Sequence, residues 1–438
     1  LLDKASIILT PTAYNNGEAL CVKPSDGSGD FDFSRNSAAT RVNAQGLVEN
    51  VQILSSNLVQ NGDFSEEGVQ EVSNGSFSQE GVELVTNGDF ATDTDWNKVN
   101  ATISGGTGNL DSTSGTSLLF QSALVVGKTY KAILNVTNYN GLGTCALINS
   151  NGDIQFEITS NGNKEFYFTQ GGSSANLNFR AVSGGIFSID NVSVREVGQD
   201  WALGTGWSIG TDKAVSDGTQ TSNSDLTQTL STPSGKSYKI TYTISEYTSG
   251  SIFVRLNSGN ITASQSSVGT FTEYISGEGG TQVSLRADAN FIGSITNISV
   301  KEVGQNWTLG TGWSIGEDKV VGDGTAFTDV SQTPILIQNK KIKLTFDVLD
   351  YVSGTFRIRP SDRQDGLDER FSGNGSYEVI YTSTVDYFRF QQQALVGSIT
   401  NISIIEITTD TSLPRINYEG FSYDGSGNVV PDSGCGSW

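Results

Sequence analysis

Few residues of this chain could take part in catalysis. The sequence has no histidine and three cysteines in 438 residues. Without histidine, the Ser-His-Asp and Cys-His nucleophile systems and the commonest transition-metal ligand are absent. Cys21, Cys145 and Cys435 are far apart and odd in number, which fits neither a disulfide framework nor a zinc site. We expect isolated thiols in or near cores, and a protein that is not an enzyme.

Carboxylates are the remaining catalytic candidates. The densest acidic stretch runs from Asp362 to Glu369. A suitably spaced pair of carboxylates can hydrolyse a glycosidic bond. A short, charged stretch of this kind is more typical of a solvated loop. A glycan depolymerase therefore stands as a second alternative for the function.

Tryptophans offer a different chemistry, because an exposed aromatic ring can stack on a sugar. Trp207 and Trp313 lie in identical Gly-Thr-Gly-Trp-Ser-Ile runs. Each is two residues from an isoleucine, Ile209 or Ile315, and so shares a strand face with it. We expect both rings in a core rather than in a sugar site. The same two interpretations apply to Trp96, Trp201 and Trp307.

The charge narrows the range of partners. The formal net charge is −21, with charged residues at 17%. A protein that binds a duplex needs a basic face, so we expect no nucleic acid. No apolar stretch reaches the length of about 18 residues that a membrane span needs, so we expect no membrane insertion. The 51 glycines and many short apolar runs favour an all-β protein with many turns.

A long internal repeat sets the domain organisation. The run that begins at Gly198 and contains Trp201 and Trp207 returns 106 positions later, starting at Gly304. Matching runs close the units, as in Gly293-Ser-Ile-Thr-Asn-Ile-Ser-Val and Gly397-Ser-Ile-Thr-Asn-Ile-Ser-Ile, and an earlier unit closes with Ser188-Ile-Asp-Asn-Val-Ser-Val. We therefore predict three modules in tandem, at residues 87–197, 198–303 and 304–407.

Inside each module, apolar residues alternate with polar ones. Tyr238, Ile240, Tyr242 and Ile244 alternate with lysine, threonine and threonine, and the same pattern recurs in the other modules. This period of two places one strand face on a core and the other in water. Modules of this length with frequent turns favour two-sheet antiparallel sandwiches. The predicted fold class is all-β, with tandem antiparallel β-sandwich (jelly-roll) modules.

A shorter repeat precedes the modules. Asn-Gly-Asp-Phe or Asn-Gly-Ser-Phe occurs at residues 61–64, 74–77 and 87–90, a spacing of 13. Thirteen residues cannot enclose a core, so each copy must pack on something else. The third copy opens the first module. We interpret the other two as duplicated first strands that form a short connector over residues 58–86.

The two ends of the chain resemble one family. Residues 22–31 and the run Arg35-Asn-Ser-Ala-Ala-Thr-Arg-Val-Asn-Ala-Gln-Gly-Leu-Val-Glu49 resemble the N-terminal module of bacteriophage fibre and spike proteins. Leu413-Pro-Arg-Ile-Asn-Tyr418 and Gly434-Cys-Gly-Ser-Trp438 resemble the continuation of that module. The resemblance covers under a quarter of the chain. It implies that residues 1–57 and 408–438 meet in space and that the sandwiches are an insertion.

The long modules resemble galactose-binding-like jelly rolls of the carbohydrate-binding-module kind. The first carries the resemblance best, through Asn87-Gly-Asp-Phe90 and Ile189-Asp-Asn-Val-Ser-Val194. In that family a structural calcium often lies between these segments, which implies Asp89 and Asp190 as metal ligands here. Ala91 departs from the family pattern, as do Thr296 and Thr400 in the later modules. No carbohydrate-binding residue is assigned.

These resemblances imply a structural protein of a bacteriophage virion. We expect a fibre, spike or decoration protein that forms a homotrimer, contacts other virion proteins and attaches to a host surface glycan. Such a protein is made in the host cytoplasm and ends on the virion surface. The first alternative is a dedicated glycan-binding adhesin. The sequence does not distinguish a head from a tail location.

Overall fold

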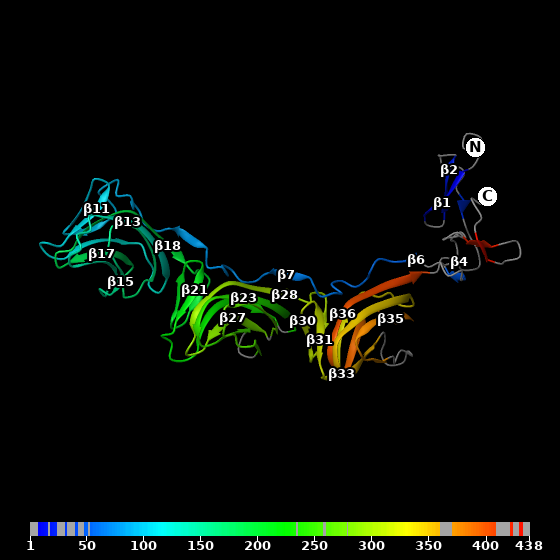
Figure 1. The fold of residues 1–438 in the computed structure, drawn as a ribbon. Coiled ribbons are helices and arrows are strands. Elements are labelled where there is room, and N and C mark those ends of the chain that lie inside the picture. Colours follow the sequence, from blue (N-terminus) through cyan, green and yellow to red (C-terminus); the bar gives the residue numbers. More distant parts are fainter. Residues whose placement is uncertain are drawn as a thin grey trace. The chain divides into compact units, whose positions relative to one another are not determined.

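The computed structural model describes residues 8–15, 18–23, 31–32, 40–42, 48–50, 53–233, 235–256, 260–277, 279–359, 370–408, 421–423 and 429–431. These residues form antiparallel strands and turns and no helix, which confirms the predicted all-β class. The chain divides into two compact units. One comprises Leu1–Ser65 with Asn306–Trp438, and the other comprises Glu66–Gln305. Figure 1 traces the chain through them.

The first sandwich lies in the second unit and has two sheets. One sheet has the order β10-β11-β18-β13-β16, with β8 also paired to β18, and the other has the order β15-β14-β17-β12-β9. Its strands are β8 (Glu80–Glu83), β9 (Asn97–Val99), β10 (Ala101–Ser104), β11 (Thr107–Asp111), β12 (Ser117–Ser122), β13 (Thr129–Thr137), β14 (Thr144–Ile148), β15 (Ile154–Glu157), β16 (Gly162–Thr169), β17 (Asn176–Val182) and β18 (Ile186–Val197).

The second sandwich repeats this topology in the same unit. Its sheets have the orders β20-β21-β28-β23-β26, with β7 paired to β28, and β19-β22-β27-β24-β25. Its strands are β7 (Glu67–Gln70), β19 (Ala202–Leu203), β20 (Trp207–Gly210), β21 (Lys213–Asp217), β22 (Ser224–Thr232), β23 (Ser237–Ser249), β24 (Ile252–Leu256), β25 (Asn260–Ile261), β26 (Gly269–Ser276), β27 (Gly280–Ala287) and β28 (Ile292–Val303).

The third sandwich, in the first unit, is one continuous nine-stranded sheet. Two long strands, β33 and β36, pair along their whole lengths and pass through both layers, where the second sandwich uses the separate strands β23, β24, β27 and β28. Its strands are β6 (Ile53–Leu54), β29 (Thr308–Leu309), β30 (Trp313–Gly316), β31 (Lys319–Asp323), β32 (Ala326–Gln332), β33 (Lys341–Ile358), β34 (Arg370–Phe371), β35 (Gly375–Thr382) and β36 (Phe388–Thr408).

Alternation of apolar residues builds each core as the sequence predicts. On β23 the side chains of Tyr238, Ile240, Tyr242 and Ile244 are at most 2% exposed, and they point away from the polar residues between them. The first and second sandwiches have separate clusters of buried side chains. Each cluster is therefore a core of its own, and each sandwich can be described as a module.

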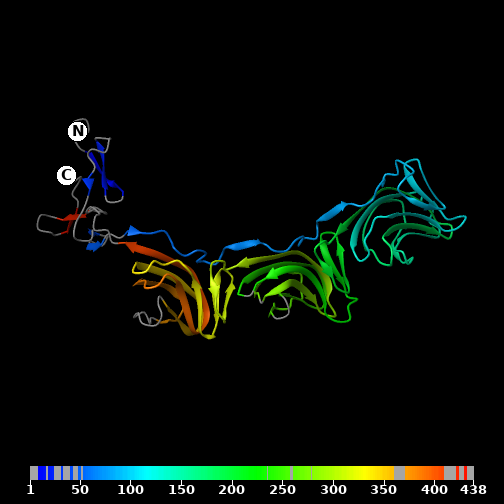
Figure 2. The ribbon, with the colours of Figure 1, turned by 180° about the vertical axis from the view of Figure 1, so that it is seen from behind.

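The short repeats close the three sandwiches in reverse order. β6 pairs with β36 of the third sandwich, β7 with β28 of the second, and β8 with β18 of the first. Figures 1 and 2 show these blue strands lying along β36 and β28. Residues 58–86 were predicted to form a connector, but they belong to three different sandwiches. The reason is that an isolated copy would leave its valine and phenylalanine exposed, whereas each sandwich buries the valine and phenylalanine of one copy.

The three copies are bound in the same way. In each, the glycine carbonyl accepts a hydrogen bond of 2.9 Å from a closing-strand N–H: Gly62 from Ile402, Gly75 from Ile298 and Gly88 from Val192. The carbonyl of the asparagine before that glycine accepts a hydrogen bond from a tryptophan Nε1, in the pairs Asn61 with Trp307, Asn74 with Trp201 and Asn87 with Trp96. The residue before the asparagine bonds through its backbone N–H and C=O to the side-chain amide of a buried glutamine, in the pairs Gln60 with Gln332, Ser73 with Gln228 and Thr86 with Gln121.

The described residues near the chain ends form small antiparallel sheets. They consist of β1 (Ile8–Asn15), β2 (Glu18–Lys23) and β3 (Phe31–Asp32), of β4 (Thr40–Val42) and β5 (Val48–Asn50), and of β37 (Phe421–Tyr423) and β38 (Val429–Pro431). No described strand of 8–50 pairs with one of 421–431. The sequence predicts that residues 1–57 and 408–438 meet. Ile53 pairs with Thr408. The rest of this predicted contact falls on residues outside the described ones.

Candidate functional site

The tryptophans of the repeats lie in cores, as the sequence predicts. Trp207 and Trp313 are 7% and 5% exposed, and Trp96, Trp201 and Trp307 are also buried. Trp207 contacts the ring of Phe291, and the Nε1 of Trp313 donates to the Thr328 carbonyl at 3.1 Å. None of these five rings can stack on a sugar at the surface.

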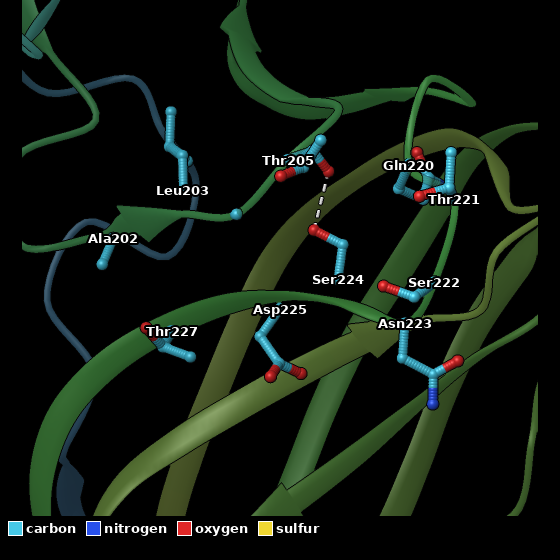
Figure 3. Close-up of a pocket in the computed structure, with 11 residues that line it drawn as sticks. Ala202, Leu203, Thr205, Gln220, Thr221, Ser222, Asn223, Ser224, Asp225 and Thr227 are labelled. Atoms are coloured by element: carbon cyan, nitrogen blue, oxygen red, sulfur yellow. Dashed lines mark hydrogen bonds between the residues drawn. The ribbon is translucent and has the colours of Figure 1, made fainter.

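A polar pocket of about 380 Å³ lies on the second sandwich, beside the edge formed by β19 and β22. Hydroxyl and amide side chains dominate its wall (Figure 3). Ser224 Oγ donates to the Thr205 carbonyl at 2.7 Å, which ties the loop after β19 to the start of β22. The lining residues are Ala202, Leu203, Gly204, Thr205, Gln220, Thr221, Ser222, Asn223, Ser224, Asp225 and Thr227.

Asp225 is the carboxylate of this pocket, and two arginines hold it. Its oxygens lie 2.8 Å from Arg286 Nε and 3.0 Å from Arg255 Nη2. Burial raises the pKa of Asp225, but the hydrogen bond from Arg286 and the charge of Arg255 outweigh burial, and the pKa lies below its ordinary value. The carboxylate is therefore ionised at neutral pH and fully engaged. An ionised carboxylate is not a proton donor.

The pocket can bind a ligand by hydrogen bonds, since Thr221, Ser222, Asn223 and Thr227 offer both donors and acceptors. Its lining contains one carboxylate, so it lacks the pair that glycoside hydrolysis needs. No motif in the sequence indicates this pocket. Asp225 and Arg286 meet because they are directly opposite each other where β22 pairs with β27.

In the first sandwich, the two candidate calcium ligands accept hydrogen bonds from residues one or two positions away in the chain. Asp89 Oδ1 accepts from the Ala91 N–H at 3.3 Å. Asp190 accepts from the backbone N–H and side-chain amide of Asn191, at 2.6 and 3.1 Å. No group of three acidic, histidine or cysteine side chains converges among the described residues. Calcium needs six to eight oxygens, and the two carboxylates do not supply such a set. The calcium site stays a prediction.

In the second and third sandwiches, threonines stand at the position of Asp190. Thr296 Oγ1 donates to the Asp212 carbonyl at 2.7 Å and lies 3.4 Å from the Ser76 carbonyl. Thr400 makes the same two contacts, with Asp318 at 2.7 Å and Asp63 at 3.4 Å. In both sandwiches, one hydroxyl links the short repeat to the hairpin beside it, and the role is structural.

Among the residues that the structure describes, the other sequence candidates add no catalytic group. The acidic stretch Asp362–Glu369 lies outside the described residues. Cys145 is buried in the first core, and burial raises the pKa of its thiol to about 11. Among the described residues, no helix has the length and apolar character of a membrane span.

Comparison with known proteins yields structural likenesses alone. No family model and no curated protein matches the chain. The tandem CBM22-1–CBM22-2 domain from Paenibacillus barcinonensis Xyn10C is 10% identical, with a TM-score of 0.22, over 51% of this chain and 98% of that one. A triple jelly-roll protein in the turret assembly of an archaeal virus is 10% identical, with a TM-score of 0.19, over 74% and 90%. A protein of Sulfolobus Turreted Icosahedral Virus is 10% identical, with a TM-score of 0.17, over 71% and 89%. At such scores these likenesses carry no argument about function.

Proposed function

We propose that this protein is a structural, non-enzymatic component of a bacteriophage virion, a fibre, spike or decoration protein. The supporting observation is that the three sandwiches join the terminal segments at a single antiparallel pair. The chain enters the sandwiches at Ile53 and leaves them at Thr408, and these two residues pair directly. A set of modules attached in this way can project from a base without breaking the continuity of that base. The resemblance of the chain ends to a phage fibre module supports the same function.

The internal organisation suits a protein exposed to proteases and shear. The second and third sandwiches are each closed by a segment from a distant part of the chain, so their strands cannot separate without breaking long-range contacts. The bonds from Ile298 to Gly75 and from Ile402 to Gly62 are examples. The net charge of −21 favours solubility. Trimerisation would cover the edge strands that such modules otherwise leave open.

Two measurements test this function. Gold-labelled antibody against the second sandwich is expected to mark fibres or spikes on intact particles. Native mass spectrometry of the full chain is expected to give three copies of the 46.6 kDa chain. Particles that carry no label, together with a free protein in the lysate, would contradict the virion assignment. A monomer on labelled particles would contradict only the trimer.

The polar pocket favours a second candidate, a glycan-binding adhesin. Hydroxyl and amide groups in a shallow pocket match the hydroxyl groups of a sugar. A glycan array probed with the full chain tests it, with Asn223→Ala as the pocket variant and Thr270→Ala, on β26, as the control. Binding that Asn223→Ala abolishes and Thr270→Ala preserves would support the adhesin. Equal binding by both variants would exclude this pocket.

The absence of enzymatic activity is itself testable. Incubation of the full chain with host surface polysaccharide is expected to release no reducing sugar. Steady release that scales with protein concentration would show a depolymerase and would overturn the non-enzymatic part of the proposal.

A further inference from the structure

The segments that close the first and second sandwiches are nearly interchangeable. Residues 67–77 and 80–90 share the pattern Glu-Gly-Val-x-x-Val-x-Asn-Gly-x-Phe. We call them closing segments, and we call the groups that bind them the socket of each sandwich. Both phenylalanines are 2% exposed, with Phe77 against Trp201 at 5.4 Å between ring centroids and Phe90 against Trp96 at 5.3 Å. The sequence-specific contacts of one closing segment are therefore available to the other.

Charge matches both closing segments to both sockets. Glu67 lies 2.6 Å from Lys239 and 2.8 Å from Lys301 in the second sandwich. Glu80 lies 2.9 Å from Lys131 and 3.6 Å from Arg195 in the first. Strand pairing places these cations at the same positions, since Lys239 is opposite Lys301 and Lys131 is opposite Arg195. A glutamate at the start of the segment thus meets two cations in either socket.

The segment that closes the third sandwich is different. At the position of Glu67 it has Leu54, which pairs with Ile407. The third sandwich has Lys343 opposite Ile405, and Lys343 pairs with Glu378 rather than with the closing segment. In the second socket, residues 54–64 would leave Lys239 and Lys301 without their shared carboxylate. Ser55 would also take the place of Gly68, where a Cβ would lie 2.7 Å from Gln305 Nε2.

The closing segments are bound as edge strands, so a second chain can supply them. β7 and β8 each pair on one side only, with β28 and β18. Val69 and Val82 on these strands are 77% and 78% exposed. Neither segment is held by its own hairpin, because each lies far along the chain from most of its socket. The same hydrogen bonds form whichever chain provides the segment.

We propose that the sockets of the first and second sandwiches are binding sites for a Glu-Gly-Val-x-x-Val-x-Asn-Gly-x-Phe segment, and that a second copy of this chain can provide it. Strand exchange of this kind links copies without creating a new surface. The two sockets accept either closing segment, and their paired cations favour these segments over residues 54–64, which lack the glutamate.

The first test uses a full-length chain whose second socket is vacated. In Gly75→Val, the new Cβ would lie 2.0 Å from the Ile298 carbonyl oxygen, so the segment cannot stay bound. Labelled peptides of residues 67–79, 80–92 and 54–66 are titrated by fluorescence anisotropy. The first two are expected to bind with Kd values within about threefold of each other. The third is expected to bind about tenfold more weakly, because it lacks the two ion pairs of Glu67 and places a Cβ 2.7 Å from Gln305 Nε2.

The control is the 80–92 peptide with Gly88→Val, which is expected not to bind, because its Cβ would meet a carbonyl oxygen in the same way. A folded Gly75→Val chain that binds neither peptide overturns the proposal. Binding of 67–79 but not 80–92 overturns the interchange of segments. Equal binding of 54–66 overturns the selection by charge.

A second test does not depend on folding of a glycine variant. Gln70 and Lys301 are opposite each other on β7 and β28. A Gln70→Cys chain and a Lys301→Cys chain are unfolded together, refolded and oxidised, and disulfide-linked dimers are quantified on a non-reducing gel. The matched control pairs Gln70→Cys with Thr272→Cys, which lies on β26 away from the socket. We expect several-fold more dimer in the test pair. Equal amounts in both pairs overturn exchange between chains.

Discussion

Replacing Phe77 with alanine tests the closure of the second sandwich by a distant segment. Phe77 belongs to a segment next to the first sandwich in sequence, yet its ring is buried in the core of the second, against Trp201. If the short repeats formed a connector, truncating this ring would leave all three sandwiches unchanged. The structure instead predicts damage to residues 207–303 alone.

The expected size of the effect follows from burial. Phe77 is 2% exposed, and truncating a buried phenylalanine costs about 3–5 kcal/mol. The ring pair with Trp201 contributes about 0.5–1.5 kcal/mol of this. For a module of this length we expect the unfolding midpoint to fall by roughly 15–30 °C.

Calorimetry and hydrogen exchange read by mass spectrometry measure the two parts of this prediction. Peptides from β21, β23 and β28 should lose protection in Phe77→Ala, whereas peptides from β13 and β18 should keep it. Phe90→Ala is the matched control, because it carries the same change in the segment that closes the first sandwich. It should give the opposite pattern. Equal loss of protection in both sandwiches, or no loss in the second, would show that Phe77 does not close the second sandwich.

Three further predictions concern single side chains. Glu67→Gln should lower the stability of the second sandwich by under about 1 kcal/mol at pH 7, because the bonds from Lys239 and Lys301 lower the pKa of Glu67 and these pairs are partly exposed. A depressed pKa gives its full stabilisation above the ordinary value of 4.5. The difference between variant and parent in urea denaturation should therefore shrink below pH 4.5 and vanish as the pH falls through the lowered pKa of Glu67 in the folded state. Cys145 should resist iodoacetamide at pH 8 until the chain unfolds, since burial raises the pKa of its thiol to about 11. Rapid labelling of Cys145 in the native protein, read by mass spectrometry of its peptide, would contradict its burial. Asp190→Thr should fold within about 1 kcal/mol of the parent in EDTA, because threonine serves at this position in the other sandwiches. A rise in its melting temperature on adding calcium would show that the ion binds without this carboxylate.

The fold class and the strand faces were predictable from sequence because they depend on local pattern. The alternation around Tyr238 and Ile240 appears directly as a buried face of β23. The placement of Trp207 and Trp313 followed from their spacing to isoleucines on the same strands. These inferences need the period of a strand and nothing from distant parts of the chain.

The closure of the sandwiches was not predictable in the same way. The sequence places the third short repeat at the start of the first module, but it does not say which sandwich each of the first two repeats joins. Their turns also use conformations that local rules disfavour. Phe64 and Phe77 both have φ of 58°, which a bulky residue adopts only when packing holds it there. The packing comes from Trp307 and Trp201, far away in the chain.

The pocket depends on pairing across a sheet as well. Asp225 meets Arg255 and Arg286 because β22, β24 and β27 are neighbours in one sheet, an order that is not sequential. A sequence pattern gives the outward direction of each of these side chains. It does not give the strand order that brings them together.

Carbodiimide cross-linking of the full-length protein measures which closing segment lies in which sandwich, because it joins carboxylates to amines that already form ion pairs. In the monomeric fraction, we expect peptides containing Glu67 to be joined to Lys239 or Lys301, and peptides containing Glu80 to be joined to Lys131. Glu67 joined chiefly to Lys131 within a single chain, or joined to no lysine of the second sandwich, would contradict this expectation.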